Sequence, residues 1–159
     1  MKKSLIAYFS ATGNTKKLAE TLQKASGADL FEIMPTQVYT DEDLNWHNDN
    51  SRSSAEMKDK SARPEIKNKI EDMGKYQIIF LGFPIWWYTA PRIIDTFLES
   101  YDFSGKAIVP FATSGSSEMD NISDSLKEVC IGKASFMKGK RFANYDISSL
   151  KKWIDSLNI

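Results

Sequence analysis

The stretch that decides the fold is Ser10-Ala11-Thr12-Gly13-Asn14-Thr15, which follows the apolar run Leu5–Phe9 and precedes a helical pattern. A buried strand that ends in small hydroxyl residues and a glycine, and then turns into a helix, forms an anion pocket from free backbone N–H groups. Lys16 and Lys17 lie near the positive end of the predicted helix dipole, a conflict that a bound anion would relieve. Alternatively, the hydroxyl and amide side chains only cap the helix. Taken alone, the stretch leaves both interpretations open.

Beyond this stretch, strand and helix patterns alternate along the chain. Apolar runs predict strands at Leu5–Phe9, Leu30–Met34, Ile78–Phe83, Ala107–Ala112 and Ala134–Met137. Apolar stripes at helical spacing follow these runs at Leu18–Ala25, Ile66–Met73, Ile93–Leu98, Ile122–Val129 and Ile147–Leu157. Because parallel strands need crossover connections, the alternation predicts an α/β fold of three layers, a doubly wound parallel sheet with helices on both faces. Pro110 lies inside the fourth strand although it has no N–H for the sheet.

Length and pattern predict a single domain over residues 1–159. Residues 35–63 form a polar segment without periodicity, which is too long for an ordinary connection between strand and helix. We expect this segment to be a functional loop, a candidate lid, or else disordered.

Charge and cysteine content narrow the classes of partner. The chain has 21 basic and 21 acidic residues, so nothing in its charge suggests nucleic acid or an anionic membrane as a partner. Cys130 is the only cysteine, which excludes an intramolecular disulfide and fits a cytoplasmic protein. No apolar stretch reaches the length of a transmembrane helix, so we expect no membrane insertion.

Three segments follow strands at the edge of the sheet where ligands of such folds bind. They are Ser10–Thr15, Pro84-Ile85-Trp86-Trp87-Tyr88-Thr89-Ala90-Pro91 and Thr113-Ser114-Gly115-Ser116-Ser117. Three consecutive large aromatic residues cannot all point into one core, and an exposed aromatic face suits a planar ligand. Taken singly, the second segment could cap the core and the third could cap a helix. Together, an anion pocket, an aromatic wall and a donor-rich loop predict a site for a phosphorylated planar cofactor.

On these motifs the chain resembles the flavodoxins. Ser10–Thr15 is similar to their phosphate loop, and Gly82–Pro91 and Thr113–Gly115 resemble the two loops that flank the flavin. The likeness runs in order through nearly the whole chain and is weakest at 35–63. It implies a flavodoxin-like, five-stranded parallel sheet of order 2-1-3-4-5, of the short-chain type that lacks an extra loop in the last strand.

The resemblance also implies a cofactor, non-covalently bound FMN, and its binding residues. The phosphate would lie on Ser10, Ala11, Thr12, Gly13, Asn14 and Thr15. The isoalloxazine would lie between Pro84, Ile85, Trp86, Trp87 and Tyr88 on one side and Thr113, Ser114, Gly115 and Ser116 on the other. Either Trp86 or Trp87 is expected to stack on the ring. No catalytic residue and no metal ligand is assigned.

Two functions remain open under this resemblance. In the first, the protein is an electron carrier that serves a redox partner protein; its small size and the absence of a visible nicotinamide site favour this. In the second, it is an FMN-dependent NAD(P)H oxidoreductase that acts on a quinone or similar small electron acceptor; the long 35–63 segment and the even charge favour this. Electron-carrier flavodoxins often have a glycine beside flavin N5, whereas Ile85–Ala90 contains none.

The sequence also suggests roles for some residues outside the three segments. His47 is expected in an exposed loop, while Tyr39 and Trp46 could fold over the flavin and Arg52 could reach an anion. Structural roles are expected for the others: a core thiol for Cys130, a solvated helix face for Asp95, Glu99 and Asp102, and a solvated turn for Lys138–Arg141.

Overall fold

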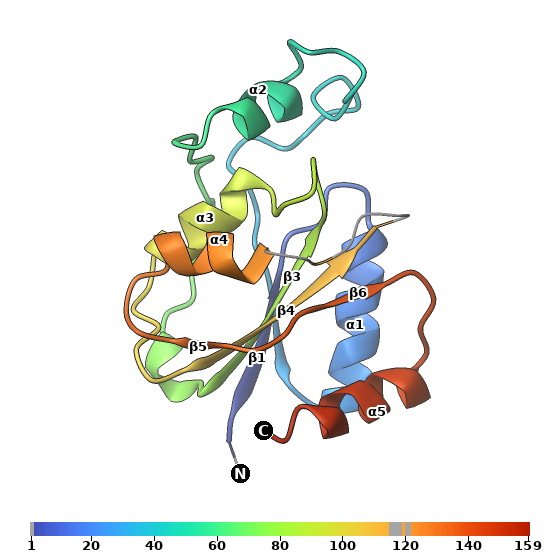
Figure 1. Cartoon of the computed structure of the whole chain (residues 1–159), viewed down its shortest axis with the longest axis vertical. Helices are drawn as coiled ribbons and strands as arrows, with labels where there is room; N and C mark the ends of the chain where they lie inside the picture. The colour runs from blue at the N-terminus through green and yellow to red at the C-terminus, as the bar shows by residue number, and fades with distance from the viewer. Residues whose placement is uncertain (1, 115–118, 120–121) are drawn as a thin grey trace.

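A parallel sheet of strand order β2-β1-β3-β4-β5 forms the centre of the computed structural model, which describes residues 2–114, 119 and 122–159 (Figure 1). The strands are β1 (Ser4–Tyr8), β2 (Asp29–Glu32), β3 (Ile78–Pro84), β4 (Ala107–Thr113), β5 (Ser135–Phe136) and β6 (Lys140–Phe142). All the pairings between these strands are parallel. The predicted α/β fold and the strand order that the resemblance implied are confirmed.

Helices cover both faces of this sheet. They are α1 (Asn14–Ser26), α2 (Arg52–Lys58), α3 (Arg92–Glu99), α4 (Ile122–Val129) and α5 (Ile147–Ser156), with a 3₁₀ turn at Met73–Lys75. Figure 1 shows α1 and α5 side by side on one face and α3 and α4 on the other, while α2 lies beyond one end of the sheet. None of these helices is both long and apolar enough to span a membrane, within the part of the chain that the structure describes.

The core has two halves because side chains alternate along each strand. In β1, Leu5 and Ala7 pack on the side of α3 and α4, whereas Ile6 and Tyr8 pack on the side of α1 and α5. Each of these four residues is at most 2% exposed. Continuous apolar strands are typical of a parallel sheet covered on both faces, as the sequence predicted.

The last sheet position is filled by two short strands, β5 and β6, because of Pro110. Successive residues of β4 direct their backbone N–H and C=O groups alternately toward β3 and toward the last sheet position. Ile108 faces the last position, because its carbonyl accepts the N–H of Met137 at 2.9 Å. Pro110 therefore faces the same neighbour, where it has no N–H to donate. Pairing resumes one residue out of step, with Phe136 opposite Ile108 but Lys140 opposite Phe111. Only Met137–Gly139 separate the two strands, in agreement with the short-chain type.

The helix predicted around Ile66–Met73 is wrong. Ile66 instead forms an antiparallel bridge with Pro35, and the N–H of Lys67 donates to the carbonyl of Met34 at 2.7 Å. The backbone groups that a helix would use are thus paired with the chain leaving β2. Ile66 and Ile70 still pack against the core, which explains why their spacing suggested a helix.

Residues 35–63, called the excursion below, fold around helix α2 and attach to α3. Arg92 donates to the carbonyls of Glu56 and Met57 at 3.2 and 2.9 Å, and Arg63 pairs with Glu99 at 2.7 Å. Asp95 lies within 4 Å of both arginines and is only 7% exposed, so its expected place on a solvated face is wrong. Burial raises the pKa of the Asp95 carboxyl, although Arg63 and Arg92 act in the opposite direction.

Candidate functional site

The loop between β1 and α1 caps the start of α1 through Ser10 rather than through the N-cap residue. Gly13, at the N-cap position, has a φ of 94° and no side chain with which to cap the helix. The hydroxyl of Ser10 accepts hydrogen bonds from the N–H groups of Gly13 and Lys16, both at 3.1 Å. A positive φ suits glycine, so the sequence fixes this bend at little conformational cost. The loop is therefore held by Ser10 from within.

Backbone donors remain at this helix start. Among the described residues, the N–H groups of Thr12, Asn14 and Thr15 have no hydrogen-bond partner. The first turn of α1 has no acidic residue. The free N–H groups and the helix dipole together favour an anion at this position.

The loop after β3 forms a tight turn with a backbone that is unusual for its residues. Trp86 and Thr89 exchange two backbone hydrogen bonds, at 2.9 and 3.0 Å. Between them Trp87 and Tyr88 have φ values of 46° and 67°. Two positive φ values at the central positions define a type I′ turn, for which asparagine and glycine are the usual residues. The turn is therefore strained, and the strain places two aromatic side chains outside the core.

Trp86 and Trp87, which the sequence left as alternatives, have different environments. Trp86 is half-buried and packs edge-on against Phe9 and Tyr39, with ring centroids 5.8 and 5.5 Å away. Trp87 is 43% exposed and Tyr88 is 79% exposed. Only Trp86 of the three lines the larger cavity described below.

The end of β4 is tied to both of the other loops. The hydroxyls of Thr113 and Thr15 are 2.8 Å apart, and the carbonyl of Thr113 accepts the N–H of Ile85 at 3.1 Å. Arg141 donates to the carbonyl of Ser114 at 3.1 Å. The expectation of a solvated turn at Lys138–Arg141 is therefore wrong, because its last two residues belong to β6. The expected site residues Gly115 and Ser116 lie outside the described residues.

A cavity of about 660 Å³ joins these three loops. Its lining includes Thr12 of the first loop with Asn14 and Lys17 at the start of α1, Pro84, Ile85 and Trp86 at the second loop, and Thr113 and Ser114 at the third. Four other expected residues of the first segment are not among the residues that line it: Ser10, Ala11, Gly13 and Thr15. Trp87 and Tyr88 line a second cavity instead. The volume lies within the usual range for sites of small molecules and cofactors.

A fourth segment, Phe142–Tyr145, also lines this cavity and was missed from the sequence. It follows the last strand at the same edge of the sheet as the other three loops. The rule that ligands bind beyond strand ends would have found it, had the last strand been predicted to continue to Phe142. Pro110 interrupts that strand, and so the prediction stopped at Met137.

Tyr39, at the start of the excursion, packs edge-on against Trp86. It is 7% exposed, its hydroxyl donates to Glu56 at 2.5 Å, and the guanidinium of Arg52 lies 3.8 Å from its ring centroid. Burial raises the pKa of the Tyr39 hydroxyl, and Glu56 raises it further. Arg52 also pairs with Glu56 at 2.9 Å and donates to the carbonyl of Gln37 at 2.7 Å. Arg52 is thus engaged within the excursion, and its expected contact with a bound anion stays a prediction.

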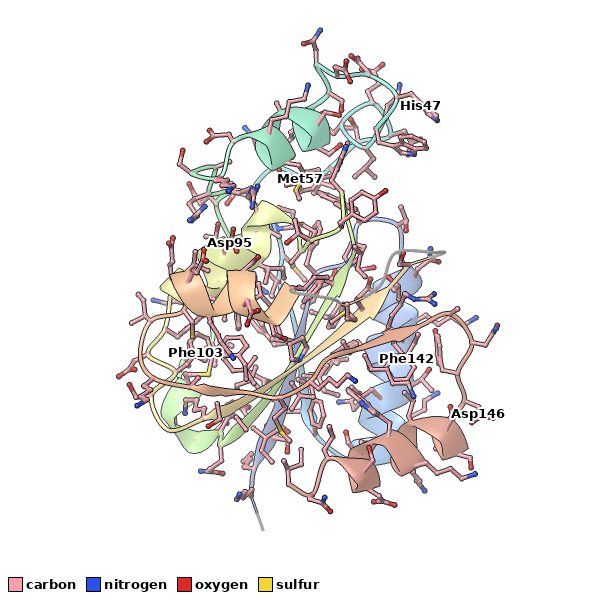
Figure 2. All side chains as sticks on the ribbon, in the orientation of Figure 1. His47, Met57, Asp95, Phe103, Phe142 and Asp146 are labelled. Carbon is pink, nitrogen blue, oxygen red and sulfur yellow. The ribbon has the colours of Figure 1, made fainter. Side chains whose placement is uncertain are left out.

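The other single residues are placed as follows. His47 is exposed, as expected, and stacks on Trp46 with ring centroids 3.7 Å apart (Figure 2). Cys130 packs against the core, and burial raises the pKa of its thiol to about 11. In the described part of the chain, no group of histidine, cysteine and acidic residues could hold a metal ion.

Comparisons with known proteins agree with this fold. The chain is 45% identical to a candidate flavoprotein of Bacteroides eggerthii DSM 20697, covering 100% of this chain and 99% of that one with a TM-score of 0.91. It is 24% identical to a flavoprotein of Lactobacillus acidophilus NCFM solved in complex with FMN, covering 97% and 99% with a TM-score of 0.74.

Flavodoxin 1 of Escherichia coli (strain K12) is 29% identical over 110 residues, which cover 67% of this chain and 46% of that protein. The match thus spans about half the length of this relative. The family model described as "Flavodoxin" matches residues 3–157. The chain belongs to the flavodoxin family.

Proposed function

We propose that this protein binds FMN non-covalently and transfers electrons through it. The observation that carries the proposal is the cavity of about 660 Å³ that joins the start of α1, where the first turn has no acidic residue, to the ring of Trp86. FMN has a phosphate at one end and a flat ring system at the other, so the cavity offers each end a suitable surface. The complex of the Lactobacillus relative with FMN supports the same cofactor.

The phosphate end of the site is built mainly from backbone. The N–H groups of Thr12, Asn14 and Thr15 donate to the phosphate, and Lys17 adds a positive charge from the lining of the cavity. Ser10 holds the loop in shape through its two hydrogen bonds, so that little ordering is needed when the anion binds.

The ring end of the site is built from side chains that are already fixed. Trp86 is held edge-on by Phe9 and Tyr39, and it offers the isoalloxazine an apolar wall. The carbonyl of Ser114 is fixed by Arg141 on the opposite side. Bound FMN supplies the redox chemistry, while these residues orient its ring and shield it from water.

Two electron partners fit this site, a redox protein or a small-molecule electron acceptor. The primary proposal is a carrier that works between proteins. The alternative, an NAD(P)H oxidoreductase that acts on a quinone or similar small molecule, is favoured by one observation, a second cavity beyond Trp86. We place this function in the cytoplasm, because a single cysteine allows no intramolecular disulfide and the cytoplasm is a reducing compartment.

The test begins with the purified protein and its visible spectrum. We expect a yellow protein, or a colourless one that takes up FMN in a one-to-one ratio with quenching of FMN fluorescence. Failure to bind FMN would contradict the proposal. Anaerobic titration then separates the two functions. A carrier is reduced by dithionite but only slowly by NADPH, whereas rapid reduction by NADPH alone would identify the enzyme.

A further inference from the structure

A second cavity, of about 370 Å³, lies between the excursion and the aromatic turn. The excursion contributes Leu44, Trp46 and Ser53 to its walls, and the turn contributes Trp87 and Tyr88. Ile85 and Trp86 line both this cavity and the larger one. A molecule bound here would therefore be separated from the cofactor ring by little more than the indole of Trp86.

The lining of this cavity is aromatic and uncharged. No acidic or basic residue is among the described residues that form it. The cation of the neighbouring helix, Arg52, is already engaged by Glu56, by the carbonyl of Gln37 and by the Tyr39 ring. A charged ligand would gain no counter-charge from this lining. The cavity is thus unsuited to a nucleotide and suited to a neutral ring.

Three of the aromatic side chains that line the cavity are exposed to solvent and are not part of the hydrophobic core. Trp46 is 64% exposed, Trp87 43% and Tyr88 79%. The chain holds Trp87 and Tyr88 outward through two positive φ angles, which residues with large side chains rarely adopt. Backbone strain of this kind is concentrated at ligand sites. The exposed rings, and the strained backbone that holds two of them outward, together mark this hollow as a binding site.

The excursion also holds its share of the walls in a defined position. The N–H of Leu44 donates to the carbonyl of Thr40 at 3.1 Å, and the N–H of Ser53 donates to the carbonyl of Asp43 at 3.0 Å. The excursion is in turn fixed to α3 by Arg92. The cavity is therefore formed between two anchored parts of the chain.

We propose that this cavity binds a neutral, planar aromatic molecule of one or two fused rings. This deepens the proposed function, because it specifies the class of small molecule that can approach the cofactor through Trp86. It rests on that function only for the position of FMN, since binding of the aromatic molecule requires no cofactor.

The experiment is a calorimetric titration of the FMN-saturated protein with 1-naphthol, which is neutral, and with 1-naphthalenesulfonate, which has the same rings and a negative charge. We expect saturable binding of naphthol and at least 10-fold weaker binding of the sulfonate, because the lining offers no cation. Trp46→Ala and Tyr88→Ala should each weaken naphthol binding at least 5-fold. Val38→Ala is the matched control, since Val38 is an exposed apolar residue of the excursion outside this cavity.

Three results would overturn the inference: no naphthol binding up to its solubility, equal affinity for both probes, or equal affinity of the wild type and Trp46→Ala. FMN affinity is measured in parallel by fluorescence quenching. If the protein fails to bind FMN, the proposed function fails, and the same naphthol titrations on the FMN-free protein still decide the present inference.

Discussion

The loops after β1 and β3 lie next to each other, and both contain positive φ angles, but they use them differently. In the first loop the residue is Gly13, at 94°, and the bend leaves backbone N–H groups free. In the second loop the residues are Trp87 and Tyr88, and the bend places large side chains at the surface. The first loop is thus built to present backbone, and the second to present aromatic rings.

Helices α1 and α5 pack together, and their starts are capped by different groups. In α5, Asp146 and Ser149 form a capping box in which a carboxylate accepts the N–H of Ser149. In α1, the neutral hydroxyl of Ser10 accepts the N–H groups at the same two helix positions, those of Gly13 and Lys16. The start of α5 therefore already has a negative charge, whereas the start of α1 has none of its own and remains suited to an anion.

The largest expected effect comes from adding a negative charge to the first loop. Asn14→Asp places a carboxylate where the FMN phosphate is proposed to bind, and charges about 4 Å apart repel by about 4 kcal/mol at an intermediate dielectric constant. We expect FMN affinity to fall by about 100-fold or more, measured by fluorescence quenching. Ser148→Asp is the matched control, since it adds the same charge to the exposed first turn of α5. A similar loss in both variants would contradict the assignment of the phosphate site.

The next effect distinguishes the two tryptophans of the second loop. Trp86→Ala removes a half-buried ring from Phe9 and Tyr39, and we expect a loss of about 2 kcal/mol in unfolding free energy. FMN affinity should fall about 10-fold. Trp87→Ala should change each quantity by less than half as much, because its ring is 43% exposed and lies outside the larger cavity. The reverse order, in urea unfolding and FMN titration, would show that Trp87 forms the ring wall.

A smaller pair of effects tests the positive φ angles directly. Gly13→Ala should lower the unfolding free energy by about 1 kcal/mol, and Tyr88→Gly should raise it by a similar amount, because only glycine adopts these angles without strain. Both are measured by urea unfolding of the FMN-free protein. Gly105→Ala is a matched control, since Gly105 has a φ of 76° and open space around it, as Gly13 does. If Tyr88→Gly were destabilising, the turn would not be strained as inferred.

The smallest effect concerns the capped helix and its pH dependence. Hydrogen bonds from the backbone N–H and the hydroxyl of Ser149 lower the pKa of Asp146 below its ordinary 3.8. The ionised carboxyl therefore stabilises the fold above the unfolded pKa, and this contribution is lost as the pH falls through the lower folded pKa. Asp146→Asn should be less stable than wild type at neutral pH, and the difference should shrink on acidification below the ordinary pKa of 3.8, measured by urea unfolding without FMN. A pH-independent difference would contradict a titrating cap.

Sequence periodicity predicted the sheet, four of its covering helices and three of the four loops at the site. It failed where apolar residues at helical spacing pack on the core without forming a helix. Ile66 and Ile70 have helical spacing, but they pack on the core from a segment that pairs with the chain around Pro35. The break in the last strand depends on which neighbour Pro110 faces, and this is known only once the strands are aligned.

The sequence by itself determined the layered fold and pointed to the loop that we propose binds an anion, because apolar spacing and the Ser10–Thr15 stretch act locally. Only the tertiary structure decided that Trp86, and not Trp87, lines the larger cavity, since the choice depends on packing against Phe9 and Tyr39. The same holds for the Phe142–Tyr145 wall and for the second cavity. Each of these features is made by residues far apart in the chain, and no local pattern encodes such contacts.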